Sequence, residues 1–190
     1  MAYIGQQLEN PVTGEKLTFI ETAGSTDGER VVVDLELAPD GKVPGVHIHP
    51  NQEETFEVLQ GTMKFRYGMK KIVAKAGETV VVPAGKVHDF ANAGALPAHV
   101  RVTISPALRM EEMFETNVAL AKEGNVMKSG MPKPLELALF VREFRDEVRA
   151  PFPPPFVVHA LMAPLAAIAK RRGRNCRYRP ADCSGAPVIA

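Results

Sequence analysis

Apolar and polar positions alternate through much of the first half of the chain. Residues 31–37 place apolar side chains at every second position, which is the period of a half-buried strand. Residues 56–58, 63–67 and 100–104 alternate in the same way, and residues 79–82 form a short continuous apolar run. Turns rich in Gly, Pro, Asn and Asp separate these segments. Many short strands at close spacing predict a β-sandwich or barrel over residues 17–104.

The period changes to that of a helix after residue 105. Ser105 suits the N-cap of a helix and Pro106 suits its first position, so we expect a helix to begin there. Gly124 suits the position just beyond its end. The apolar face of this helix consists of Met110, Met113, Phe114 and Ala121.

Two further helices are predicted beyond a polar linker at residues 125–134. The first carries an apolar stripe of Leu137, Val141, Phe144 and Val148 and ends at the prolines of residues 151–155. The second covers the apolar residues 156–169, with Pro164 as a kink or a break. From Arg172 onward we expect poor order.

This pattern divides the 190 residues into a mainly β part and a helical part. We predict a β-barrel at residues 1–105 and a helical extension at residues 106–171, which packs on the barrel or on a partner. Residues 172–190 form a basic, disordered tail. No internal repeat is visible, so the chain holds one barrel.

Composition and charge limit the classes of function. Hydrophobic residues make up 45% of the chain, charged residues 24%, and the net charge is +1, as in soluble globular proteins with no nucleic-acid partner. Six Lys and Arg residues fall between Lys170 and Arg179. They could touch phosphate or an anionic membrane surface, but a solvated tail is the simpler interpretation.

The first residues lack the basic and apolar segments of a signal peptide, and no apolar run is long enough to span a membrane. The two cysteines, Cys176 and Cys183, both lie in the tail, which argues against a disulfide framework. We therefore expect a cytoplasmic protein.

The candidate chemistry lies in two long spaced patterns. The first consists of Gly41, five residues, His47, one residue, His49, four residues, Glu54, six residues and Gly61. Because side chains two apart on a strand share a face, His47 and His49 can bind one ion together.

The second pattern consists of Gly77, five residues, Pro83, one residue, Gly85, two residues, His88, three residues and Asn92. His88 shares a strand face with Phe90, which we expect to point inward.

Strand phase selects among the remaining candidate ligands. Glu54 shares its face with the apolar Phe56, whereas Glu53 shares its face with polar neighbours and should meet water. His99 alternates outward and His159 lies in the helical extension, so neither is expected to be a ligand. Imidazole and carboxylate ligands together suit a divalent transition metal. The predicted ligands are His47, His49, Glu54 and His88.

These two patterns resemble the two motifs of the cupin superfamily, and the fifteen residues between Gly61 and Gly77 resemble the spacing in small single-domain bacterial cupins. The resemblance implies one jelly-roll, or double-stranded β-helix, barrel with a C-terminal α-helical extension. It also implies that the same four residues, His47, His49, Glu54 and His88, hold one metal ion inside the barrel.

Four protein ligands leave open positions on a five- or six-coordinate ion. Iron, manganese, nickel and copper accept such geometry, whereas zinc is more often closed by four ligands, so the identity of the metal stays open. The side chains expected to point inward are mostly apolar or aromatic: Phe56, Val58, Met63, Phe65, Tyr67, Phe90, Val102 and Ile104. Tyr67 is the only one with a polar tip and is a candidate proton or hydrogen-bond donor.

The sequence leaves three functions open. The first is a metal-dependent oxygenase, such as a dioxygenase, that acts on a small aromatic or enol-type molecule chelated to the metal. The others are a non-catalytic module that binds or senses a small ligand through the metal, and a metal-dependent isomerase. The expected partners are a small-molecule ligand and a second copy of the chain. Membrane contact by residues 156–172 is a weaker alternative, because Pro164 and the modest length favour packing on the barrel.

Overall fold

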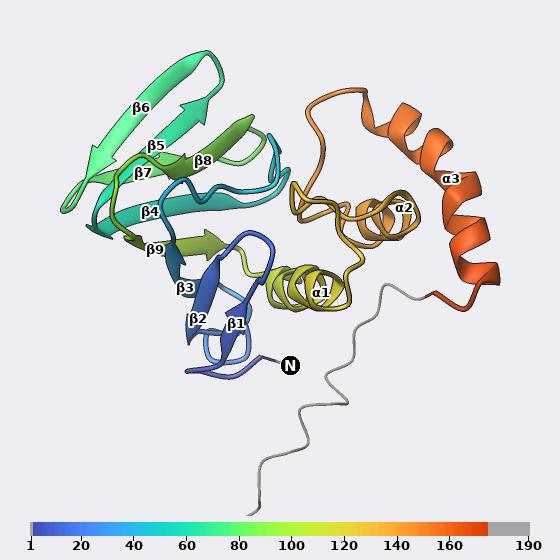
Figure 1. The fold of residues 1–190 in the computed structure, drawn as a ribbon, viewed down its shortest axis with the longest axis horizontal. Helices are drawn as coiled ribbons and strands as arrows, with labels where there is room; N and C mark the ends of the chain where they lie inside the picture. Colours follow the sequence, from blue (N-terminus) through green and yellow to red (C-terminus); the bar gives the residue numbers. More distant parts are fainter. Residues whose placement is uncertain (1, 175–190) are drawn as a thin grey trace, which may run out of the picture.

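The structure, a computed structural model, describes residues 2–174 as two antiparallel β-sheets followed by three helices (Figure 1). The larger sheet has the strand order β1-β2-β3-β9-β4-β7 and the smaller sheet the order β6-β5-β8. The strands are β1 (Gln7–Glu9), β2 (Lys16–Glu21), β3 (Val31–Leu37), β4 (Glu53–Gln60), β5 (Thr62–Tyr67), β6 (Lys70–Lys75), β7 (Thr79–Val82), β8 (His88–Asn92) and β9 (Ala98–Ser105). The predicted fold class, a jelly-roll with a helical extension, is confirmed.

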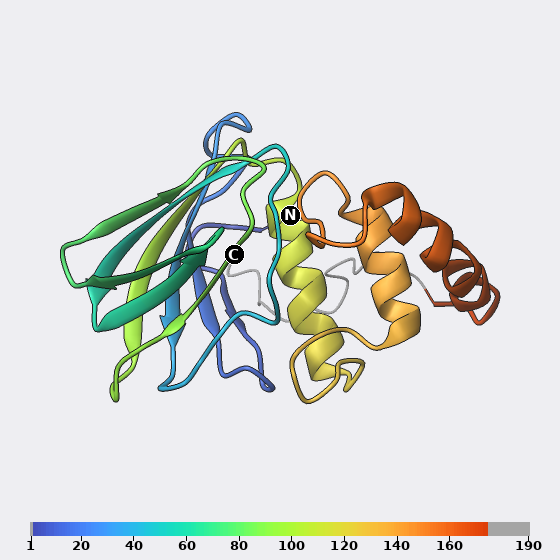
Figure 2. The same cartoon turned by 90° about the horizontal axis from the view of Figure 1, so that it is seen from above.

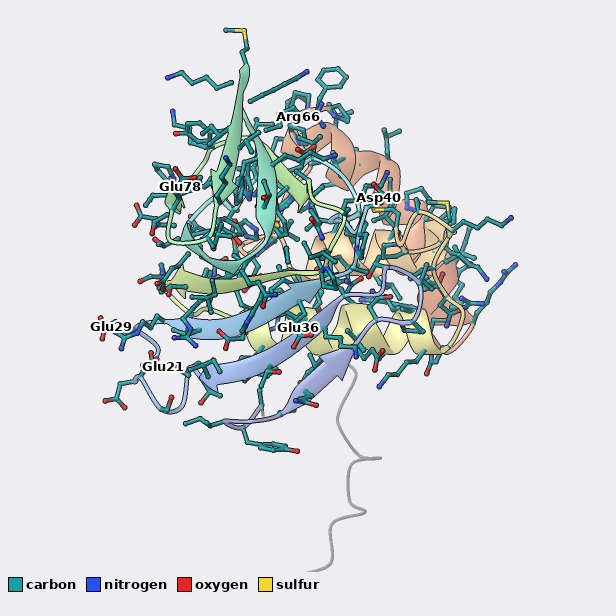
Figure 3. The ribbon with its side chains drawn as sticks, turned by 60° about the vertical axis from the view of Figure 1, so that its left-hand side comes forward. Glu21, Glu29, Glu36, Asp40, Arg66 and Glu78 are labelled. Atoms are coloured by element: carbon teal, nitrogen blue, oxygen red, sulfur yellow. The ribbon has the colours of Figure 1, made fainter. Side chains whose placement is uncertain are left out.

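The two sheets bury their apolar faces against each other. Strand β9 shows the alternation clearly, since Ala98, Val100, Val102 and Ile104 are buried and the residues between them are partly exposed. The aromatic rings of Phe65 and Phe90 both contact the ring of Phe56, with centroid distances of 5.1 and 4.9 Å. Charged side chains such as Glu36, Arg66 and Glu78 lie on the outside (Figure 3).

The apolar side chains expected to point inward are all buried, as alternation predicted: Phe56, Val58, Met63, Phe65, Phe90, Val102 and Ile104. Tyr67 is only partly buried and packs against the edge of this core.

An N-terminal hairpin, β1 and β2, extends the larger sheet beyond the strands that the sequence predicted. Its turn is tied by Asn10, whose Oδ1 accepts hydrogen bonds from the backbone N–H of Val12 at 3.0 Å and of Thr13 at 3.2 Å. A three-residue strand such as β1 is too short to show a period in the sequence.

The helices are stacked away from the barrel in chain order (Figure 2). Helix α1 (Met110–Lys122) lies directly against the barrel and adds Met110, Met113 and Val118 to the core. Helix α2 (Pro134–Glu143) follows, and α3 (Pro155–Arg171) is outermost. No helix in residues 2–174 is long and apolar enough to cross a membrane.

The predicted start of the first helix is wrong. Helix α1 begins at Met110, and the Ser105 hydroxyl donates to the carbonyl of Glu29 instead of capping a helix. The buried amide of Gln52 donates to the carbonyls of Pro106 and Ala107, which holds this segment against the barrel as a turn. The helix therefore starts only after that turn.

The second and third helices also differ from their predictions. Helix α2 ends at Glu143, so Phe144 and Val148 lie beyond it, where the chain turns back towards the barrel. Helix α3 continues through Pro164, so of the kink or break expected there the break does not occur. Most of the basic tail that was expected to be disordered, together with Cys176 and Cys183, lies outside the described residues.

Candidate metal centre

The four predicted ligands come from three places in the barrel and meet at one point. His47 and His49 lie between β3 and β4, Glu54 is the second residue of β4, and His88 opens β8. Two backbone hydrogen bonds of 3.0 Å join His47 to His88. One ligand atom from each of the four side chains lies within 4.8 Å of the others. Two ligands of one first-row ion lie at most about 4.2 Å apart, so this cluster needs little movement to hold one.

The cluster is shielded from water. His49, Glu54 and His88 are buried, and His47 is partly exposed. Oε1 of Glu54 lies 3.5 Å from Nε2 of His49, and its Oε2 lies 2.7 Å from Nε2 of His88. The carboxylate thus lies between two of the three imidazoles.

Backbone carbonyls orient all three rings. Nδ1 of His47 lies 3.1 Å from the carbonyl of Gly45, and Nδ1 of His88 lies 3.0 Å from that of Lys86. Nδ1 of His49 lies 2.6 Å from the carbonyl of Glu147. A carbonyl can only accept, so each Nδ1 carries the proton, and a neutral ring then offers the lone pair of Nε2 to a metal.

Two buried atoms in this cluster fit a cation. Nε2 of His88 and Oε2 of Glu54 are close, but they are not aligned for a hydrogen bond and have no other hydrogen-bond partner among the described residues. Buried polar atoms almost always have partners, so such a pair needs an explanation. A divalent ion that accepts a lone pair from each atom would explain why both lack a partner. The residues therefore fit the metal that the two patterns imply.

The charges of the cluster favour a neutral His47 and an ionised Glu54. Burial, together with the neighbouring His49, lowers the pKa of His47 to about 4. Burial raises the pKa of Glu54, but the adjacent His49 and His88 outweigh this effect and hold it at about 2. Burial lowers the pKa of His88, but the adjacent carboxylate of Glu54 outweighs this effect and raises it above its usual value.

The three residues that were not expected to be ligands lie away from the cluster. Glu53 is exposed, His99 lies 3.4 Å from the carboxylate of Asp34 on the barrel surface, and His159 is on α3. The structure therefore brings together the four predicted residues and none of these three. Their role as metal ligands stays a prediction.

Tyr67 lies close to the cluster in the fold but not in its cavity. It is paired with His88 across β5 and β8, yet it is not among the residues that line the cavity described below. Side chains of directly paired residues point to the same side of a sheet, so Tyr67 lies on the same face as His88, as its alternation in the strand predicted. Its catalytic role stays a prediction.

A cavity of about 220 Å³ leads to His47, His49 and Glu54. The barrel contributes apolar side chains such as Phe56 and Phe90, and the helical extension contributes the opposite wall. The walls from the extension include Met110, Met113, Phe114, Val118, Leu137, Phe140 and Val141. The site is therefore a chamber between barrel and helices that is partly open to solvent.

The sequence did not reveal that the extension helps to build the centre. The segment after α2 pairs with the ligand-bearing segment through two hydrogen bonds of 2.9 Å between the backbones of Ile48 and Arg149. The same segment supplies the Glu147 carbonyl to His49, 98 positions away in the chain. No local pattern signals a backbone contact of this kind.

Comparison with known proteins agrees with the motifs. Residues 33–105 match the family model described as a cupin domain. Germin-like protein 1 of Brassica napus is 38% identical over 78 residues, which cover 38% of this chain and 37% of that protein. Tetracenomycin polyketide synthase protein TcmJ of Streptomyces glaucescens is 28% identical over 92 residues, covering 48% of this chain and 60% of TcmJ. The chain thus spans less than two thirds of the length of these relatives.

Solved structures with similar folds are more distant in sequence. A predicted oxalate decarboxylase from Thermotoga maritima superposes with a TM-score of 0.47 and 20% identity, over 54% of this chain and 92% of that one. Similarity at this level carries no information about the reaction.

Proposed function

Since residues 33–105 of this chain form a cupin domain, we propose that the protein is a metal-dependent oxygenase for a small aromatic or enol-type molecule. The proposed ligands of one divalent transition metal are His47, His49, Glu54 and His88, whose donor atoms converge. We also propose that the protein acts as a cytoplasmic homodimer.

The observation that carries this proposal is the apolar chamber that opens onto the cluster. A cavity of about 150 Å³ holds a molecule the size of benzene, so about 220 Å³ suits a monocyclic molecule or a short diketone. A three-ring flavonol would require the chamber to open. Phe56, Phe90 and the residues of α1 would exclude water from the bound molecule.

A divalent transition metal held there would supply Lewis-acid polarisation of a chelating substrate oxygen and an open position for dioxygen. The chain itself orients the three imidazoles through the carbonyls of Gly45, Lys86 and Glu147 and keeps Glu54 ionised. The apolar walls would set the orientation of the substrate.

The main alternative is a module that binds or senses a small ligand without reaction. Besides the proposed ligands, the titratable side chains that line the chamber are Glu15 and Arg149, within the described part of the chain. Neither comes from the strands that carry the cluster, so a proton-transfer reaction such as isomerisation lacks an obvious acid or base beside the metal. Oxygen uptake decides between oxygenase and binder.

The first test is the metal content of protein purified without added metal. We expect about one transition-metal ion per chain in the wild type, near-zero content in His47→Ala and His88→Ala, and unchanged content in the neighbouring control Glu53→Gln. Tight metal binding by both histidine variants would contradict the ligand assignment.

The second test is oxygen consumption with monocyclic catechols and short β-diketones as substrates. An oxygenase consumes oxygen with at least one of these compounds, and the uptake is lost in His47→Ala. Metal-dependent binding of the same compounds with no oxygen uptake would favour the binding module.

A further inference from the structure

The chamber that leads to the candidate metal ligands has a second polar end. Asn10 and Glu15, from the turn between β1 and β2, both line it. Asn10 is 1% exposed, and its Oδ1 is already used by the turn. Its Nδ2 is buried without a hydrogen-bond partner in residues 2–174. Because Asn10 lines the chamber and this N–H₂ group lacks a partner, the group can donate to a ligand acceptor that reaches it.

Glu15 provides the second polar group at this end. The hydroxyl of Thr13 donates to its Oε2 at 3.3 Å, which leaves the other carboxyl oxygen open. Burial raises the pKa of Glu15 to about 7, although the Thr13 hydroxyl lowers it. Near neutral pH this carboxyl is therefore often protonated and can donate as well as accept.

The two polar ends are separated by a short, apolar stretch of the chamber. Gly130 packs between the β1–β2 turn and the segment that carries His47, since an added Cβ there would lie 2.7 Å from Thr13 and 3.1 Å from Pro44. Pro44 and His47 are three residues apart, which limits their backbone separation to about 11 Å. Apolar side chains including Leu17, Val33 and Leu35 also line the chamber. A single small molecule can therefore extend from one end to the other.

We propose that the chamber binds a two-ended ligand, with chelating oxygens at the histidine cluster and a neutral hydroxyl or carbonyl group at Asn10 and Glu15, joined by an apolar body. Only the chelating end rests on the function proposed above. An anionic group at the Asn10 end is disfavoured, because it would face the Glu15 carboxyl. The one cation that lines the described chamber is Arg149. Its backbone is hydrogen-bonded to that of Ile48, next to His49, at the histidine end of the chamber.

The test uses two matched pairs of probes with the full chain, at pH 8. The pair 4-(2-hydroxyethyl)catechol and 4-ethylcatechol differs only in the distal hydroxyl and is measured with metal-loaded protein. The pair 2-phenylethanol and ethylbenzene lacks a chelating group and is measured with metal-free protein. Each affinity is first corrected for the partition of that probe from water into an apolar solvent. In each pair we then expect the hydroxyl-bearing probe to bind about tenfold more tightly than its partner.

The key variant is Asn10→Asp, which keeps the oxygen that Val12 and Thr13 need and replaces the free N–H₂ with a second oxygen. A hydroxyl can still donate to the new carboxylate but has no N–H₂ from which to accept, so we expect the preference for the hydroxyl to fall by severalfold in both pairs. A second variant, Glu15→Leu, should lower the preference by severalfold. The control Asn125→Asp, at a site outside the chamber, should keep the preference. The preference is a ratio within one protein, so a loss of folded protein in a variant does not change it.

Separate outcomes contradict the two proposals. Equal preference for the hydroxyl in the wild type and in Asn10→Asp overturns the second polar end, and this holds whether or not the protein binds a metal. Loss of the metal effect on catechol binding overturns the metal-dependent function, and the hydroxyl preference of the non-chelating pair then still tests Asn10.

Discussion

At the scale of single residues, the backbone determines what each imidazole can do. Each of the three clustered histidines has its Nδ1 next to a carbonyl, so the ring nitrogen that faces the cluster is the unprotonated one when the ring is neutral. Glu54 lies among them with its charge stabilised by the rings around it. The site is therefore preorganised for a cation before any ion arrives.

Glu15 makes folding stability depend on pH. Its folded pKa, about 7, lies above the ordinary 4.5, so the folded chain binds more protons than the unfolded chain between these values. Stability is then greatest below about pH 4.5 and falls as the pH rises towards 7. We expect Glu15→Gln to be more stable than the wild type by about 2 kcal/mol at pH 8 and equal to it near pH 4.5. Urea unfolding at both pH values measures this, and an equal effect at both would contradict it.

At the scale of elements, the segment after α2 acts as a brace for the centre. Helix α2 ends at Glu143, and Phe144 is buried beneath the Arg109 guanidinium, which lies 5.3 Å from the centre of its ring. This contact directs the chain back to the barrel, where Arg149 pairs with Ile48 and Glu147 meets His49. The helical extension is thus part of the site.

Breaking this pairing should weaken metal binding. Arg149→Pro removes the N–H that donates to the carbonyl of Ile48, whereas the control Arg149→Ala keeps it. Loss of the brace frees the His49 ring, and lost support of a ligand typically reduces metal affinity by about tenfold or more. Competition with a chelator measures the affinity. Equal affinities in the two variants would show that the brace has no influence on the centre.

At the scale of the whole molecule, α3 is the outermost element of the helical extension (Figure 2). It packs on α2 through a small apolar cluster that includes Ala138, Leu139, Ala166 and Ala169. Large apolar side chains on its outer side are exposed, among them Phe156 at 76% and Leu161 at 59%. Exposed apolar surface of this kind is typical of contact with a partner.

The homodimer expected from the sequence is therefore best tested on α3. Leu161 and Ile168 are seven residues apart and share a helix face. We expect the double variant Leu161→Asp and Ile168→Asp to be monomeric in analytical ultracentrifugation, while Met69→Asp, at an exposed turn far from α3, stays dimeric. A monomeric wild type would contradict the dimer itself.

Most of the strands and the positions of the four candidate ligands could be predicted from the sequence. Alternation separated Glu54 from Glu53 and identified Phe56 and Phe90 as buried, because a strand assigns each side chain to a face by local geometry alone. The start of α1 was predicted wrongly, because Gln52 holds residues 106 and 107 in a turn from more than fifty positions away.

What the sequence alone determined is the type of barrel and the positions of its four candidate metal ligands, since both depend on spacing along one strand or turn. Only the tertiary structure decided that the site is a chamber between barrel and helices, that the helical extension orients His49, and that Asn10 and Glu15 line the far end. These features join residues far apart in the chain, such as His49 and Glu147, which are 98 positions apart. Such contacts form through packing that leaves no local period in the chain.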